Sequence, residues 1–569
     1  MTRIHIFFLM LGLCLVSNLC KAKIVDMTDF GLSAINPEMA EVKISRAFDF
    51  CIREQHKSKE KIIIKFEKAV YRISSSDVLF RMKDCQNIEI DGCGSTFLFS
   101  KIAGFASIID SSNITLRNFT LDWSRPYISQ AEITDMTTEY IDLKIDKQKY
   151  PWYIKGKRLK FICGGKEYGA AEYGYNIVYS KDGNIFKGSF DNYSLTSVIN
   201  GPAEELAEGI IRCHGKIEKT YPLGNIIAIW HITYKTPWCI STDSENIFLK
   251  DITIRHTTGC GVVSVCTKDM TIDNVDYITA ESRCFTGIAD AFHIVHNSGK
   301  FLMQNCDIDG QGDDALNVHG KYLNIVSRNN RKNKFRYIVP AGHPLLHPGD
   351  SIWGISKTNM QRIALGKVSK LRKTGVGTIA RGERKILGEI YEITLSQGIR
   401  VPETVTFFEN ASYNPEVIIR NNTFGRANRA RGILLTSPCK TIVEENVFKS
   451  SGTAILIEGD TDFWLESGGI NGLVIKNNIF DKCHSSPWGS AVIAFSPSHK
   501  PDKSDSGMYH KNVYIINNRF IMDSAELLFL RSVENLIFEN NRIEGNTPVI
   551  IKESYKGENI QTLTENKRD

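Results

Sequence analysis

Several features that define common protein classes are missing from this 569-residue sequence. It has 14 cysteines, but no C-x-x-C pair and no Cys/His cluster at the spacing of zinc ligands, so we expect no metal and no cofactor. No basic block interleaved with aromatic residues is present, and we expect no nucleic-acid partner. No Ser-His-Asp order, P-loop or G-x-G-x-x-G motif indicates another chemistry.

Long hydrophobic runs are also scarce. An apolar stretch from Ile6 to Val16 follows a short positive segment and precedes a plausible cleavage site at Cys20-Lys21-Ala22. It is shorter than the roughly 20 residues that span a bilayer, and no later segment reaches that length, so we expect no membrane span. We predict that residues 1–22 are a signal peptide and that the chain is exported, periplasmic or secreted. Lipoprotein anchoring through Cys14 or Cys20 is less favoured, because Leu precedes each.

What the sequence does have is a short repeat. Alternating apolar residues, two polar residues that are often Asn-Asn, and a further apolar residue recur, as in Val417–Asn422 and Tyr514–Arg519. Several neighbouring copies are 22 to 24 residues apart, a period typical of a β solenoid and shorter than the roughly 40 residues of a propeller blade. Stacked turns about 4.8 Å apart bury the apolar face of each strand, and Asn at a fixed corner can form amide ladders. We predict an all-β, right-handed parallel β-helix and not a propeller or sandwich.

The repeat is preceded by a helical pattern and interrupted twice. Ala40, Ile44, Ala47, Phe48 and Cys51 share helical spacing, which predicts an amphipathic helix that caps the open end of the solenoid. Two stretches without the repeat contain alternating strands and Gly-rich turns, which predict inserted β-barrel-like modules. The expected organisation is a signal peptide (1–22), a cap and first turns (23–124), a module (125–235), turns with the candidate site (236–320), a second module (321–414) and C-terminal turns (415–569).

The cysteines that remain after the signal peptide are scattered, and we interpret them as buried thiols within strands. Cys260, Cys266, Cys284 and Cys306 fall in or beside consecutive repeat units. One or two disulfides among them are the alternative in an oxidising compartment, and the sequence cannot pair them.

Three aspartates stand out when the strands that follow the Asn corner are aligned on their apolar positions. In that register Asp290 and Asp314 occupy the same position one turn apart, and Asp313 directly precedes Asp314. Clustered carboxylates raise one another's pKa, so that one tends to keep its proton near neutral pH. Glycoside hydrolysis needs one protonated carboxylic acid and one ionised partner. The alternative is that the acidic run Asp307–Asp314 is a solvated corner or a calcium loop.

The same alignment places further polar side chains on the outer surface of these strands. We expect His293, Asn317 and His319 to face the aspartates and contact substrate hydroxyls, and Glu458, two turns along, to contact sugar. Each histidine could equally be an ordinary surface residue.

The pattern resembles two known groups. Polygalacturonases of the pectate-lyase-like β-helix superfamily carry an aspartate about twenty residues before an Asp-Asp pair, although their downstream Arg-x-Lys motif is absent here, which favours a neutral sugar. A closer resemblance, carried by the phrase Gly310–Gly320 and the two insertions, is to glycoside hydrolase family 110, whose members are exo-acting α-1,3-galactosidases, inverting and without a metal requirement, some acting on the blood group B antigen.

This resemblance implies roles for the aspartates and a class of partner. Asp313 would be the general acid, while Asp290 and Asp314 would hold and deprotonate the attacking water. The partners would be oligosaccharides or glycoconjugates with terminal galactose. The sequence leaves open the oligomeric state, the need for a fucose branch and the dominant base. The alternatives are a β-helix depolymerase or lyase acting on acidic glycans, and a noncatalytic carbohydrate-binding solenoid.

Overall fold

The computed structural model describes residues 22–556 apart from 172–175, 188, 190–191, 281, 341–342, 382–383, 397–399, 500–506, 524–525 and 546–548. The expected signal peptide therefore lies outside the described residues, except for its last residue.

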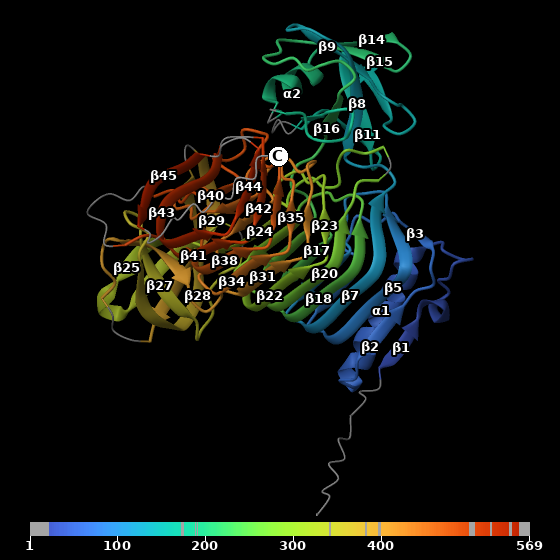
Figure 1. Cartoon of the computed structure of the whole chain (residues 1–569). Coiled ribbons are helices and arrows are strands. Elements are labelled where there is room, and N and C mark those ends of the chain that lie inside the picture. Colours follow the sequence, from blue (N-terminus) through green and yellow to red (C-terminus); the bar gives the residue numbers. More distant parts are fainter. Residues whose placement is uncertain are drawn as a thin grey trace, which may run out of the picture.

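The centre of the molecule is a coil of parallel strands stacked in three ladders (Figure 1). The first ladder contains β1 (Lys23–Asp26), β2 (Ile62–Lys65), β5 (Gln86–Phe99), β7 (Ser112–Trp123), β18 (Glu245–Ile254), β20 (Lys268–Tyr277), β22 (Ser298–Gln304), β31 (Glu416–Arg420), β34 (Thr441–Glu444), β38 (Asn471–Lys476), β41 (His510–Ile516) and β43 (Glu526–Glu539). The second ladder is formed by the C-terminal parts of the long strands β5, β7, β18 and β20 together with seven shorter strands. These are β3 (Val70–Ile73), β23 (Asp307–Ile308), β32 (Thr423–Phe424), β35 (Val447–Phe448), β39 (Ile479–Asp481), β42 (Arg519–Met522) and β44 (Arg542–Gly545).

The third ladder positions the candidate site. It contains β4 (Phe80–Lys83), β6 (Ala106–Ile109), β17 (Cys239–Thr242), β19 (Val262–Val265), β21 (Phe292–Val295), β24 (Leu316–Lys321), β33 (Ile433–Leu435), β36 (Ile455–Ile457), β40 (Ile493–Phe495), part of β43, and β45 (Val549–Lys556). The three ladders confirm the predicted parallel β-helix.

Identical side chains stack along the inside of the coil. A ladder of buried amides runs from turn to turn, with Nδ2···Oδ1 distances of 2.9 to 3.0 Å, through Asn422, Asn446, Asn478, Asn518 and Asn541. One strand further on, Phe rings stack with centroids 4.7 to 5.0 Å apart in Phe424, Phe448, Phe480 and Phe520. The predicted Asn ladder is thus confirmed, and the buried amides of successive corners satisfy one another.

A helix closes the N-terminal end of the coil. After the short 3-10 helix η1 (Met27–Phe30), helix α1 (Ala40–Lys57) lays its apolar face on the first turns. Ala40, Ile44, Ala47 and Cys51 are fully buried, as the spacing predicts. The helix covers strand edges that would otherwise be open to pairing.

The first insertion forms two sheets above the coil (Figure 1). The larger is six-stranded, in the order β13 (Ile177–Tyr179), β16 (Ile226–Trp230), β8 (Ile128–Met136), β9 (Tyr140–Lys144), β15 (Ile210–His214) and β14 (Ala203–Ala207). The smaller contains β10 (Trp152–Lys155), β11 (Arg158–Cys163) and β12 (Lys166–Tyr168), and helix α2 (Tyr193–Ile199) accompanies them. This module has its own apolar core.

The second insertion is a closed six-stranded barrel beside the C-terminal turns (Figure 1). Its strands are β25 (Leu323–Asn329), β26 (Lys334–Val339), β29 (Arg384–Leu395), β28 (Arg362–Arg381), β27 (Ser351–Ser356) and β30 (Val405–Asn410), with the 3-10 helix η2 (Asn330–Lys332). A short strand, β37 (Glu466–Ser467), returns antiparallel to the end of β24 and pairs Lys321 with Glu466.

Each cysteine in the described part of the chain is a free thiol, so the structure pairs none of the four cysteines considered for disulfides. Within the same residues, the helices are too short or too polar to cross a membrane.

Candidate active site

The structure brings the three aspartates together at the start of two adjacent strands. Phe292 of β21 pairs with Leu316 of β24, so Asp290 and Asp314, each two residues earlier, fall in one column. The Asp314 N–H donates to Asp290 Oδ1 at 3.3 Å. One oxygen from each of Asp290, Asp313 and Asp314 lies within 4.8 Å of the other two.

The loop before the Asp pair is packed, not solvated. Gln311 is 1% exposed and donates from Nε2 to Thr286 Oγ1 at 2.7 Å. Gly312 has no room for a side chain, because a Cβ there would lie 2.1 Å from the Trp230 ring and 2.2 Å from the Ile288 carbonyl oxygen. The close approach of the first inserted module therefore fixes the backbone that presents Asp313 and Asp314.

Asp314 is held by an arginine from the next turn. Arg431 donates from Nε to Oδ1 at 2.6 Å and from its terminal nitrogen to Oδ2 at 2.7 Å, and the Asp314 side chain is 1% exposed. Burial and the charges of Asp313 and Asp290 raise the pKa of Asp314, and Arg431 opposes them. Both carboxylate oxygens accept charge-assisted hydrogen bonds from Arg431, and these stabilise the ionised form against that rise.

Asp313 has weaker partners and more contact with solvent. Tyr234 donates its hydroxyl to Asp313 Oδ2 at 3.1 Å, and the nearest atom of Arg429 is 3.7 Å away. Burial and the charge of Asp290 raise the pKa of Asp313, against the nearby arginines and the tyrosine hydrogen bond. Its side chain is 18% exposed, the most of the three. Asp313 is therefore both shifted toward its protonated form and the most accessible of the three carboxyls.

Asp290 begins a chain of imidazoles. His293 Nδ1 lies 2.6 Å from Asp290 Oδ2, and its Nε2 lies 3.2 Å from His319 Nε2. His319 Nδ1 must donate to the Gly320 carbonyl at 2.7 Å, and burial holds the pKa of His319 well below its usual range. The neutral His319 ring therefore has an unprotonated Nε2, which accepts a hydrogen bond from His293 Nε2–H.

His293 is therefore the donor in both directions. Burial disfavours its charge, but the hydrogen bond and charge of Asp290 outweigh that effect, and the pKa of His293 lies above its ordinary value. Glu466 adds negative charge beyond His319, at the other end of this row of imidazoles. Its Oε1 lies 3.4 Å from both His319 Nε2 and Lys321 Nζ. In this arrangement Asp290 is the acceptor of the hydrogen bond from His293.

The remaining predicted residues lie at different depths. Asn317 is 4% exposed, and its Oδ1 has no hydrogen-bond partner among the described residues. His319 is buried beneath Glu466, whereas His293 remains partly exposed. Glu458 Oε2 lies 4.0 Å from Arg431, and burial raises the pKa of Glu458 to about 7.

Sequence reasoning missed Tyr234, Arg429, Arg431 and Glu466. Arg431 lies two residues before Ile433, which pairs with Leu316, so the register that aligned the aspartates would also have found it. Tyr234 and Glu466 lie outside the ladder strands, and no repeat signal marks them.

The measured spacing differs from the expectation for inversion. An inverting pair is expected to be roughly 6.5 to 9.5 Å apart, whereas the nearest carboxylate oxygens lie within 4.8 Å. The physical reason is that Asp313 directly precedes Asp314 in the chain, and the Asp314 N–H ties this pair to Asp290 on the adjacent rung. Separation alone therefore does not support inversion.

Fold and site together define a class. A parallel β-helix that gathers three carboxylates, two of them with a raised pKa and one fixed by an arginine, has the acid–base equipment of a glycoside hydrolase.

Comparisons with known proteins identify the family. The chain is 30% identical to alpha-1,3-galactosidase B of Bacteroides thetaiotaomicron over 94% of this chain and 89% of that protein. It is 27% identical to alpha-1,3-galactosidase A of Shewanella woodyi over 93% and 87%. Residues 129–227 match the family described as GLAA-B beta-barrel domain I, and residues 406–566 match the right handed beta helix region. The chain belongs to the alpha-1,3-galactosidase B family.

Among solved structures, the chain is similar to a hyperthermoactive exopolygalacturonase from Thermotoga maritima. The TM-score is 0.45 and the identity 12%, covering 92% of this chain and 87% of that one. This likeness is too distant to bear on the substrate.

Proposed function

We propose that the protein is an exo-acting glycoside hydrolase that removes terminal α-1,3-linked galactose from oligosaccharides or glycoconjugates. The observation that carries the proposal is the cluster of Asp290, Asp313 and Asp314, in which each carboxyl has a different hydrogen-bond partner. Membership of the alpha-1,3-galactosidase B family supplies the sugar and the linkage.

Asp313 is the general acid in this proposal. Partial burial and the charge of Asp290 raise its pKa, and its side chain, 18% exposed, is the one of the three that a substrate can reach most easily. Its proton passes to the glycosidic oxygen as the bond to the anomeric carbon breaks.

Asp290 and Asp314 hold the attacking water, and Asp290 accepts its proton. Asp290 Oδ2 already binds His293, and both oxygens of Asp314 bind Arg431. A covalent ester at either carboxylate would weaken these contacts by removing its negative charge, whereas a bound water leaves the charge in place. We therefore favour inversion despite the short spacing.

The surroundings fit a neutral sugar. The Arg431 fork is occupied by Asp314, and the Arg429 guanidinium lies over the Trp488 ring, with 4.6 Å from its central carbon to the ring centroid. Neither provides the bidentate cation that a uronic acid substrate needs. Asn317 Oδ1, His293 and Glu458 offer hydrogen-bond partners for hydroxyl groups.

The test is a panel of linear and fucosylated α-1,3-galactosides, α-1,4-galactosides and polygalacturonate. Release of free galactose from the α-1,3 substrates, lost in Asp313→Asn and kept in Asp307→Asn from the same acidic run, supports the proposal. An unsaturated product from polygalacturonate would indicate a lyase. Turnover of no glycan would indicate a binding solenoid.

We also propose that the chain is exported, on the strength of the N-terminal pattern in residues 1–22. Mass spectrometry of the protein recovered from a cell fraction tests this. A mature N-terminus at Lys23 in a periplasmic or secreted fraction supports it, and an intact Met1 in the cytosol contradicts it.

A further inference from the structure

A second group of reactive side chains lies at the other end of the third-ladder strands. The residues that follow β17, β19 and β21 are Asp243, Cys266 and His296, and each has a left-handed backbone, with φ of 48°, 53° and 52°. The Asp243 N–H donates to the carbonyl of Val265, and the Cys266 N–H to that of Val295. Three successive turns therefore place an Asp, a Cys and a His in one column.

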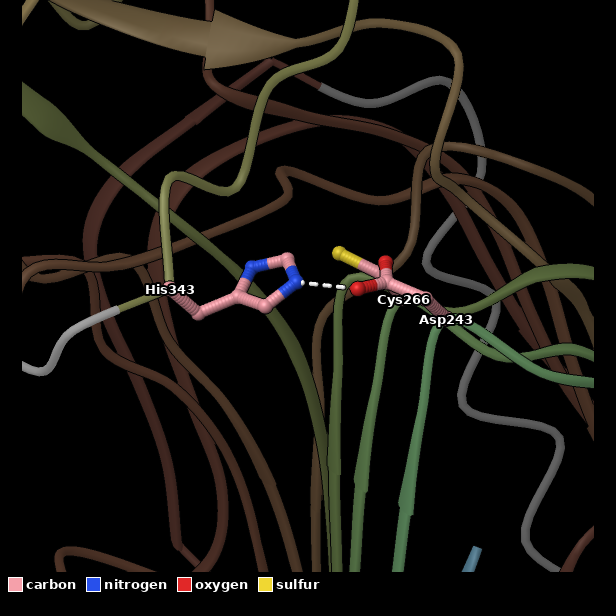
Figure 2. Close-up of side chains that lie close together, drawn as sticks. All are labelled: Asp243, Cys266 and His343. Atoms are coloured by element: carbon pink, nitrogen blue, oxygen red, sulfur yellow. Dashed lines mark hydrogen bonds and ion pairs between the residues drawn. The ribbon is translucent and has the colours of Figure 1, made fainter. Parts of the chain in front are cut away.

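The inserted barrel brings two more histidines to this column. His343 and His347 precede β27 in the loop between β26 and β27. His343 Nε2 donates to Asp243 Oδ2 at 2.7 Å, and Figure 2 shows the Cys266 thiol beside the same carboxylate. One ligand atom from each of Asp243, Cys266 and His343 lies within 4.8 Å of the others. His347 Nε2 is 3.4 Å from Asp243 Oδ1.

These donors match a tetrahedral transition-metal site. Zinc binds sulfur at about 2.3 Å and nitrogen or oxygen at about 2.0–2.2 Å, which puts tetrahedral ligands about 3.3–3.8 Å apart. The present spacing of Asp243, Cys266 and His343 needs shifts of the order of 1 Å to reach this geometry, while His347, 3.4 Å from Asp243, must move further to become the fourth ligand. A carboxylate and a thiolate would together neutralise a divalent cation, and the two histidines are separated by three residues, a common spacing in zinc sites.

We propose that Asp243, Cys266, His343 and His347 bind a divalent zinc-type metal ion that fastens the inserted barrel to the solenoid. A single ion here would join side chains that come from two turns of the coil and from the barrel loop. The sequence predicted no metal site, because these ligands are about 100 residues apart along the chain and no local motif contains them.

The neighbours of the histidines support this assignment. Asp350 Oδ2 lies 3.7 Å from His347 Nδ1, and it accepts from the side chain of Asn410 at 2.8 Å. His347 Nδ1 makes no hydrogen bond among the described residues, and a small shift of the ring toward Asp350 on binding would supply the carboxylate that orients a metal-binding histidine. Asp243 Oδ1 is buried and has no hydrogen-bond partner among the described residues, so the ion would also satisfy a costly unpaired acceptor.

Two details define what binding must change. His343 Nδ1 accepts from the Leu345 N–H at 3.1 Å, so its Nε2 carries the proton that an ion would displace. Binding therefore needs the other tautomer and a small rotation of this loop, while Cys266 loses its thiol proton. His296 stays outside the ligand set, because its Nε2 already accepts from the Lys321 N–H.

The site is structural and not part of the reaction centre. Asp290 precedes β21 and His296 follows it, so six extended residues, about 20 Å, separate the aspartates from the column of Cys266. An ion at Cys266 cannot touch a sugar bound at Asp313. Metal binding is thus independent of the proposed hydrolysis, and either can fail without the other.

The experiment uses the full-length protein, stripped with a chelator and then dialysed against Zn²⁺ or Co²⁺. We expect one zinc ion per chain by elemental analysis, a thiolate-to-cobalt charge-transfer band, and a higher unfolding temperature with metal. Cys266→Ser and His347→Gln should lose the ion, and Asp350→Asn should lower the affinity about 10–100-fold. Cys439→Ser and His484→Gln, which alter a thiol and an imidazole elsewhere, should keep it.

Two results would overturn the proposal. One is wild-type protein that binds no stoichiometric zinc and shows no thiolate-to-cobalt band, a result that needs no variant to fold. The other is zinc binding that is unchanged in both Cys266→Ser and His347→Gln, because the ion would then lie elsewhere.

Discussion

Removing the arginine that holds Asp314 should make stability depend on pH. Arg431→Met keeps side-chain length but takes two charge-assisted hydrogen bonds from a carboxylate whose side chain is 1% exposed. Breaking a buried pair of this kind costs about 3–5 kcal/mol when the partner stays charged. Without the guanidinium nothing opposes burial, so the pKa of Asp314 rises further above its unfolded value of about 4.

The sign follows from proton linkage. A carboxyl whose pKa is raised in the folded state adds to the free energy of unfolding at pH values below its unfolded pKa. This added stability is lost as the pH rises through the folded pKa. The pKa of wild-type Asp314 is raised to about 8, so the deficit of Arg431→Met relative to wild type should be small near pH 6 and grow above pH 8. Its cause is the charge that the folded state must then accept in a buried site.

The assay is the shift of the unfolding midpoint at the two pH values, with Arg426→Met as control. Arg426 pairs with Asp481 at 2.8 Å, but both side chains are about one-third exposed, so its loss should cost about 1 kcal/mol or less and show little pH dependence. Equal destabilisation by the two variants at both pH values would refute the reasoning.

Three further predictions follow from other contacts. Tyr234→Phe removes a hydrogen bond that lowers the pKa of Asp313, so the alkaline limb of the kcat/KM profile should move to higher pH; an unchanged or lower limb contradicts this role. Asp290→Asn removes the partner that raises the pKa of His293, so carbon-13 NMR should show His293 titrating at lower pH in the variant than in wild type. An unchanged His293 titration would mean that the two side chains do not form an ion pair. Phe448→Ala leaves a gap in the stack between Phe424 and Phe480 and should cost about 3–5 kcal/mol in unfolding measurements, with a loss below 1 kcal/mol contradicting the packing argument.

The repeating part of the molecule could be predicted because its physics is local. An Asn at each corner and alternating apolar residues return with each turn, so the strand register, the ladder through Asn446 and the column of Asp290 and Asp314 follow from the spacing. The capping helix follows in the same way from its apolar face.

The rest depends on contacts that no period encodes. Tyr234 reaches Asp313 from the end of the first insertion, and Glu466 reaches Lys321 through a short antiparallel strand. His343 reaches Asp243 only because a barrel closes beside the coil. Such positions are set by how the modules dock.

The anomer first released from an α-1,3-galactoside tests the central claim most directly. Proton NMR, recorded before mutarotation, reports the configuration of the free galactose. If Asp313 protonates the leaving oxygen while Asp290 and Asp314 direct water to the opposite face, β-galactose appears first. Initial α-galactose would show that a carboxylate attacks the sugar, and that the division of roles argued from Arg431 and His293 is wrong.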